Sequence, residues 1–146
     1  MNPENQEVAI VAVDIISRMG VLDEHTCVEL IQSTPIGRVG FISDNKPLVL
    51  PVNFAWFEGG VVFRSLDGQK LSAAVDKQHV CFEIDRWEQA SHKGWSVVVQ
   101  GQAHHVTDWA EIEHLENLGL VPWATEAWRQ MWIRIEPQTI SGRQIR

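Results

Sequence analysis

The chain has 146 residues, of which 45% are hydrophobic and 21% charged, and its formal net charge is −7. This length predicts one domain with its own core. The acidic balance disfavours a general nucleic-acid binder, which would normally carry a basic face. No apolar run approaches the roughly 18 residues of a membrane-spanning helix, and no basic region followed by an apolar one marks a secretory signal. We therefore expect a cytoplasmic protein without a membrane partner.

The first element expected along the chain is a helix. Residues 1–20 carry a modest apolar pattern and are interpreted as an N-terminal extension, either a short helix or a segment lying on the domain. The domain itself is expected over residues 21–146. It begins with "LDEHTCVELIQS", where Asp23 can cap a helix and apolar residues recur at i, i+3 and i+4 from Cys27.

A change to a period of two then predicts strands. The turn sequences "DNK" and "EGG" join the first three strands as hairpins. A short helix over residues 67–77 is expected before the fourth strand, and a helix capped by Asp108 before the last one. The six predicted strands span residues 36–43, 47–56, 60–65, 79–85, 94–106 and 131–137.

This order of elements indicates the fold class. Hairpin connections imply antiparallel pairing, and about six strands with few helices are typical of a barrel. We therefore expect a mainly β (α+β) fold in which an antiparallel barrel carries a few peripheral helices.

The stretch "FRSLDGQKL" after the third strand is a candidate anion site. Arg64 ends the strand, Ser65 offers a hydroxyl, and Lys70 lies in the first turn of the expected helix, whose free N–H groups attract anions. Gly68 allows a sharp turn and a close approach of the backbone to a ligand. The alternative is a polar turn with solvated cations, and Asp67 would repel an anion if it faced the site.

Metal-binding and acid–base chemistry have weak support. His104 and His105 are adjacent and would point to opposite faces of a strand, so no metal site is expected. Cys27 and Cys81 share no metal or redox spacing, and we interpret them as reduced, buried thiols. Two carboxylates on the fourth strand, at positions 83 and 85, are interpreted as a solvated or salt-bridged face, so no catalytic residue is assigned.

A series of segments resembles the pyridoxamine 5'-phosphate oxidase-like flavoproteins, and more narrowly their small, mostly actinobacterial branch of FMN-binding split-barrel proteins. The segments are "TPIGRVGFISDNKPLVLPVNFAWFEGGVVFRSLDGQKLSAAV", "VCFEID", "GWSVVVQGQA" and "WIRIEPQTISGR", and they cover roughly residues 22 to 145. The resemblance implies a six-stranded split barrel that forms a homodimer. It also implies two FMN molecules, each in a cleft between the subunits.

The resemblance also implies roles for individual residues. The FMN phosphate would be bound by Arg64, Ser65 and Lys70. The isoalloxazine would lie beside the strand formed by Pro51, Val52, Asn53 and Phe54. The second subunit would contribute Trp95 and Ser96, with Gln100 or Gln102 nearby; for Trp95, packing in the dimer core is an equal alternative. Arg38 and Arg143 are weaker candidates for contacts with phosphate, ribityl chain or substrate.

The function implied is hydride transfer between the flavin and a small organic substrate. A deazaflavin is an alternative cofactor, and a non-catalytic flavin carrier or sensor is an alternative function. The arginine- and histidine-containing tail with which true pyridoxamine phosphate oxidases hold pyridoxal phosphate has no match after "SGRQIR", so vitamin B6 oxidation is not expected.

Overall fold

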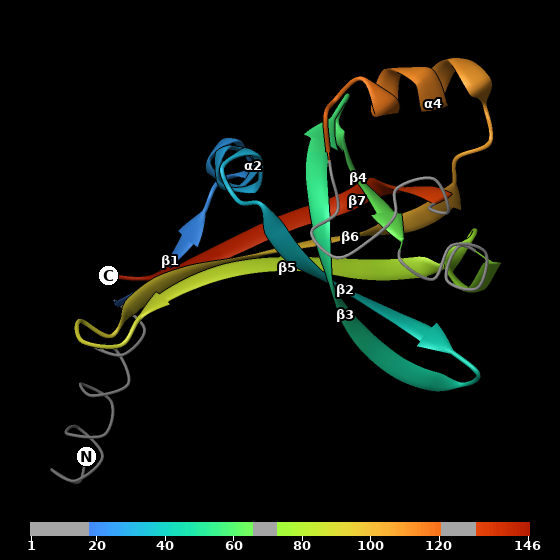
Figure 1. Ribbon diagram of the computed structural model, residues 1–146. Coiled ribbons are helices and arrows are strands. Elements are labelled where there is room, and N and C mark those ends of the chain that lie inside the picture. The colour runs from blue at the N-terminus through green and yellow to red at the C-terminus, as the bar shows by residue number, and fades with distance from the viewer. Residues whose placement is uncertain (1–17, 66–72, 121–130) are drawn as a thin grey trace, which may run out of the picture.

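The structure, a computed structural model, describes residues 18–65, 73–120 and 131–146 (Figure 1). The expected helix over residues 67–77 falls mainly outside these ranges, as do residues 1–17 of the N-terminal extension. The elements in chain order are β1 (Met19–Leu22), α2 (Glu24–Gln32), β2 (Ile36–Ser43), β3 (Lys46–Phe57), β4 (Gly60–Ser65), β5 (His79–Glu88), β6 (Lys93–His105), α4 (Trp109–Glu116) and β7 (Met131–Ile145).

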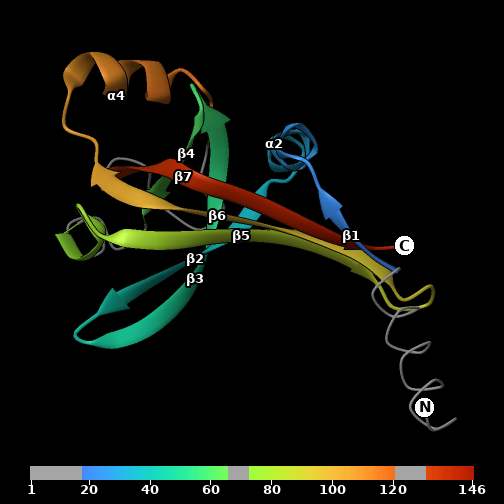
Figure 2. The same cartoon turned by 180° about the vertical axis from the view of Figure 1, so that it is seen from behind.

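Six of the strands close into a ring. Neighbouring strands follow the order β7-β4-β3-β2-β5-β6, and β6 pairs with β7 again to complete the circle. Every pairing between these strands is antiparallel. The ring opens where β2 meets β5 over three residue pairs only, because the far half of the β2–β3 hairpin extends away from the helices (Figures 1 and 2). The expected six-stranded antiparallel split barrel is therefore confirmed.

A seventh strand was not anticipated. β1 pairs with the last residues of β7, from Met19 opposite Ile145 to Leu22 opposite Gly142. The expected N-terminal extension, residues 1–20, is described only from residue 18. Its last two residues, Met19 and Gly20, are part of this strand. Four residues with little alternation carry too weak a pattern for a strand to be recognised without its partner.

The last strand is also longer than predicted. The sequence placed its end at Pro137, but β7 continues to Ile145 along β6. The register shifts between Gln100 and Gly101, where Pro137 lies opposite Gly101 and is accommodated by a bulge. A Cβ on Gly101 would lie 1.9 Å from the Glu136 carbonyl oxygen, so only glycine allows this close approach.

The core fills the inside of the ring. Its members include Phe54 and Phe82, whose rings meet edge to face with centroids 4.7 Å apart. The helix α2 adds Cys27 and Ile31 to this cluster, and it begins at Asp23, whose carboxylate accepts a hydrogen bond from the Thr26 N–H at 2.8 Å.

A second, smaller cluster lies on the outer side of the ring. Leu115 from α4 packs with Val62 of β4 and Trp132 of β7. The helix starts at the predicted cap, since Asp108 accepts from the Glu111 N–H at 3.1 Å. None of the described helices is long and apolar enough to cross a membrane.

Candidate functional site

The "PVNF" segment of β3 presents its side chains to both faces of the barrel. Phe54 is buried in the core opposite Phe63, and Val52 packs partly against the same cluster. Because side chains alternate along a strand, Pro51 and Asn53 face outward, and Pro51 lies opposite Arg38. Only these two side chains of the segment can therefore approach a ligand on the outer face.

Arg64 lies near the end of β4, on the outer face under α4. Its guanidinium carbon lies 4.6 Å from the ring centroid of Trp132, its cross-strand partner on β7. The guanidinium also forms an ion pair with Glu116 of α4, and the other oxygen of Glu116 accepts a hydrogen bond from Trp132 Nε1 at 2.9 Å. These three side chains form one polar network between the helix and the sheet.

The Arg64 side chain is almost completely buried, with 8% exposure. Burial lowers its pKa from the usual arginine value. Its Nε is buried and has no hydrogen-bond partner among the described residues. An unpaired buried donor on a cation costs stability, so an anionic oxygen that reached this nitrogen would be stabilised there.

The other predicted phosphate ligands are only partly described. Ser65 pairs through its backbone with Met131 at the end of β4, but its side chain lies outside the described residues, as does the whole of Lys70. The proposed phosphate corner is therefore represented by Arg64 alone.

The predicted residues of β6 divide between the two faces. Trp95 is half-buried and packs against the core of its own chain, while Ser96 and Gln100 lie on the opposite face, toward the exterior. Gln100 accepts a hydrogen bond from the Thr139 hydroxyl at 3.2 Å. Gln102, the alternative to Gln100, donates to the Lys77 carbonyl at 3.0 Å.

Arg38 forms a salt-bridge cluster with the two carboxylates of β5. Its Nη1 lies 3.1 Å from an oxygen of Glu83 and 3.1 Å from an oxygen of Asp85. Burial raises the pKa of Glu83, and the adjacent Asp85 adds to this increase. The salt-bridged face expected from the sequence is confirmed. Arg143 is exposed and forms no salt bridge with any described residue.

The expectation of two buried thiols holds for one cysteine only. Cys27 is buried as predicted, but Cys81 is exposed, so the prediction of two buried thiols was wrong for Cys81. The reason is that Cys81 alternates with the buried residues Val80 and Phe82 and so points outward. In the part of the chain that the structure describes, no three metal-binding side chains gather.

Two residues of the Arg64 network were missed at the sequence level. Trp132 became relevant only through its pairing with Arg64, which joins distant parts of the chain. Glu116 carried a weak signal, since it is the last residue of α4. A carboxylate is unfavourable at the negative end of a helix dipole, and its presence there indicates a nearby cation.

A six-stranded antiparallel ring with an open seam defines a split β-barrel, and comparison with known proteins gives its family. A family model described as pyridoxamine 5'-phosphate oxidase matches residues 23–144. The uncharacterized protein Rv0080 of Mycobacterium tuberculosis is 33% identical over 129 residues, which cover 85% of this chain and 84% of that protein. The chain therefore belongs to the pyridoxamine 5'-phosphate oxidase family.

Solved structures agree with this assignment. The FAD binding protein from Mycobacterium smegmatis has 34% sequence identity and a TM-score of 0.76, covering 87% of this chain and 98% of that one. A conserved protein of unknown function from Corynebacterium diphtheriae has 30% identity and a TM-score of 0.74, covering 88% and 99% respectively. A relative described as FAD-binding supports a flavin cofactor.

Proposed function

We propose that this protein is a flavin-dependent oxidoreductase that binds its cofactor on the outer face of β3 and β4, beside α4. The observation that carries the proposal is Arg64, a buried guanidinium with an unpaired Nε at the end of the strand next to "PVNF". A planar guanidinium is well suited to phosphate oxygens. In this proposal Ser65 and Lys70 complete the phosphate site, and Pro51 to Phe54 line the flavin ring, largely with backbone groups.

The cofactor proposed is FMN, with FAD and a deazaflavin as alternatives. All three carry a phosphate next to the ribityl-type chain, so Arg64 would contact a phosphate in each of them. When bound, the flavin supplies hydride chemistry, and the protein provides binding, orientation and exclusion of water. The carboxylates of Glu83 and Asp85 are held by Arg38 and are not needed for this chemistry.

We further propose that the protein is a homodimer. The β2–β3 hairpin exposes four large apolar residues, Ile42, Leu48, Val49 and Leu50, at 48%, 45%, 65% and 38%. By the register of the hairpin, Ile42 and Val49 lie on one face and Leu48 and Leu50 on the other. Exposed apolar side chains on a projecting hairpin normally mark a contact surface, and an open groove of about 590 Å³ lies beside them. The partner subunit would then bring Ser96 and Gln100, on its outer face, toward the flavin. Its Trp95, which packs partly against the core of its own subunit, would contact the flavin only with its exposed part.

A cytoplasmic location stays a prediction. The two cysteines are free in the structure, as is usual for proteins in a reducing compartment.

The test begins with the purified, full-length protein. Mass spectrometry of small molecules released on denaturation should detect FMN, FAD or a deazaflavin. Titration of the apo-protein should then show binding, and stopped-flow mixing with a reduced nicotinamide and an acceptor should show turnover of the flavin. Binding without turnover would instead support a carrier or sensor, and absence of binding to all three cofactors would refute the proposal.

A further inference from the structure

Arg64 already has an anionic partner within the chain. Glu116 forms an ion pair with the Arg64 guanidinium through one oxygen and accepts from Trp132 Nε1 through the other. In the proposed function the flavin phosphate would bind the same guanidinium at its Nε, so the carboxylate and the phosphate would be two anions beside one cation.

The two members of this ion pair differ in their freedom to move. The Arg64 side chain is 8% exposed and stacks on Trp132, whereas the Glu116 side chain is 48% exposed. Withdrawing Arg64 would leave a cavity against the ring, but Glu116 can rotate into solvent and be hydrated. If a competing anion arrives, Glu116 is therefore the partner that moves.

The position of Glu116 in its helix favours this exchange. It is the last residue of α4, where the free carbonyl groups give the helix end a negative potential. Arg64 offsets this repulsion in the ion pair. Hence Glu116 is held by Arg64 and by the hydrogen bond from Trp132 rather than by the helix, and releasing it relieves the unfavourable interaction with the helix end.

We infer that Glu116 is an internal counter-ion that competes with the flavin phosphate for Arg64, and that it sets how strongly the site discriminates between flavins. The inference rests on the proposed function, because it assumes that the flavin phosphate lies at Arg64. Repulsion by Glu116 grows with the charge of the incoming group. A phosphomonoester such as FMN carries about −1.5 to −2 charges at pH 7. FAD carries a single charge on each phosphate group, and riboflavin has no phosphate.

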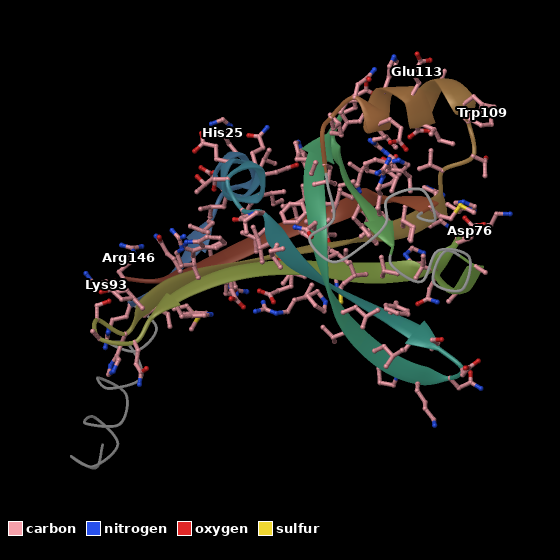
Figure 3. All side chains as sticks on the ribbon, viewed as in Figure 1. His25, Asp76, Lys93, Trp109, Glu113 and Arg146 are labelled. Atoms are coloured by element: carbon pink, nitrogen blue, oxygen red, sulfur yellow. The ribbon has the colours of Figure 1, made fainter. Side chains whose placement is uncertain are left out.

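Substitution Glu116→Gln tests the inference, since it keeps the size of the side chain and one of its two acceptor oxygens and removes its charge. The apo-protein should bind FMN about tenfold more tightly, because one competing charge-assisted contact is removed. FAD should gain less, and riboflavin should be unchanged. The control is Glu113→Gln, which removes the same charge from the side of α4 that points away from the sheet (Figure 3); it should leave all three affinities within about twofold.

Thermal unfolding provides a second readout that a purely structural role would not reproduce. Without ligand, Glu116→Gln should lower the unfolding midpoint by a few degrees, because the buried guanidinium loses its counter-ion. With saturating FMN the difference from the wild type should disappear, since the phosphate takes the place of the carboxylate.

The outcomes separate the two proposals. If the wild type binds FMN more tightly than riboflavin and Glu116→Gln leaves this ratio unchanged, the counter-ion role is overturned and the proposed function stands. The same conclusion follows if the midpoint deficit persists with FMN bound. If the wild type binds no flavin, both proposals fall.

Discussion

At the scale of single residues, Arg64 combines two roles that the sequence could not distinguish. As a structural residue it connects α4 to the sheet through Glu116 and Trp132. As a proposed ligand it offers an unpaired Nε to a phosphate. The sequence placed Arg64 correctly at the end of a strand. It could not reveal the counter-ion, because 52 positions separate Arg64 from Glu116 and only the packing of α4 brings them together.

Substitution Arg64→Ala should separate these two roles, because only the proposed phosphate contact distinguishes FMN from riboflavin. Loss of a charge-assisted contact should weaken FMN binding about tenfold to a hundredfold, while riboflavin should lose little. Isothermal titration with both flavins measures the difference. The control is Arg86→Ala, an exposed arginine on β5, which should change neither affinity. Equal losses for FMN and riboflavin would show that Arg64 acts only by holding α4.

Glu83 illustrates how an outward-facing carboxylate can oppose stability. Its pKa is raised by burial and by Asp85, while Arg38 acts in the opposite direction. A raised pKa in the folded state means that folding favours the protonated form. This stabilisation is complete below the usual carboxyl pKa of 4.5 and is lost as the pH rises through the folded-state value.

We therefore expect Glu83→Gln, which resembles the protonated form, to be more stable than the wild type at pH 7, by up to about 1 kcal/mol. The gain should shrink as the pH falls to about 4, where the wild type is itself protonated. Urea denaturation at both pH values measures it. The exposed Glu88→Gln on the same strand should show no such trend, and a loss of stability at pH 7 would mean that the Arg38 contact outweighs burial.

At the scale of elements, local signals predicted most of the fold. Strands β2 and β4 have the predicted bounds. The turns "DNK" and "EGG" are hairpin turns because Asp44, Asn45, Glu58 and Gly59 all have positive φ angles. The prediction failed where pairing with a distant strand determines the length or the existence of a strand. β7 continues past Pro137 because a bulge opposite Gly101 absorbs it, and β1 exists only through its pairing with β7.

One of these hairpins is held by an arginine from a distant strand. Arg134 of β7 is buried and donates to the carbonyl oxygens of Phe57 and Glu58 at 2.9 and 2.7 Å. It closes the β3–β4 turn and lies against Gly60, where a Cβ would approach its guanidinium carbon to 2.7 Å. The turn therefore depends on Arg134 and on the absence of a side chain at position 60.

Substitution Arg134→Met should destabilise the fold by about 2–4 kcal/mol, since two carbonyl groups lose charge-assisted hydrogen bonds. Chemical denaturation measures the loss. The matched control on the same strand is Arg143→Met, which is exposed and should change stability by no more than about 0.5 kcal/mol. Similar effects of the two substitutions would show that the carbonyl contacts contribute nothing specific.

At the scale of the whole molecule, the ring is incomplete as a single chain. Its seam between β2 and β5 is paired over three residues, and the projecting hairpin leaves apolar side chains in contact with water. The period of two predicted a strand here, but it could not tell whether its apolar side chains face a core or a partner. No residue in the described part of the chain covers them.

Substitution Val49→Glu places a charge on the proposed dimer surface, where Val49 is 65% exposed in the single chain. A stable interface buries roughly 800 Å² per partner with an apolar centre, and an unpaired carboxylate there carries a large desolvation cost. Sedimentation velocity at micromolar concentration should therefore show a wild-type dimer and a folded monomer of the variant. The control is Val21→Glu on β1, where Val21 is 76% exposed outside that surface; this variant should remain dimeric.

If the flavin site lies between subunits, Val49→Glu should also lose flavin affinity, and this loss should lessen as the protein concentration is raised. A wild-type monomer, or a Val49→Glu dimer as stable as the wild type, would place the subunit contact elsewhere or remove it altogether.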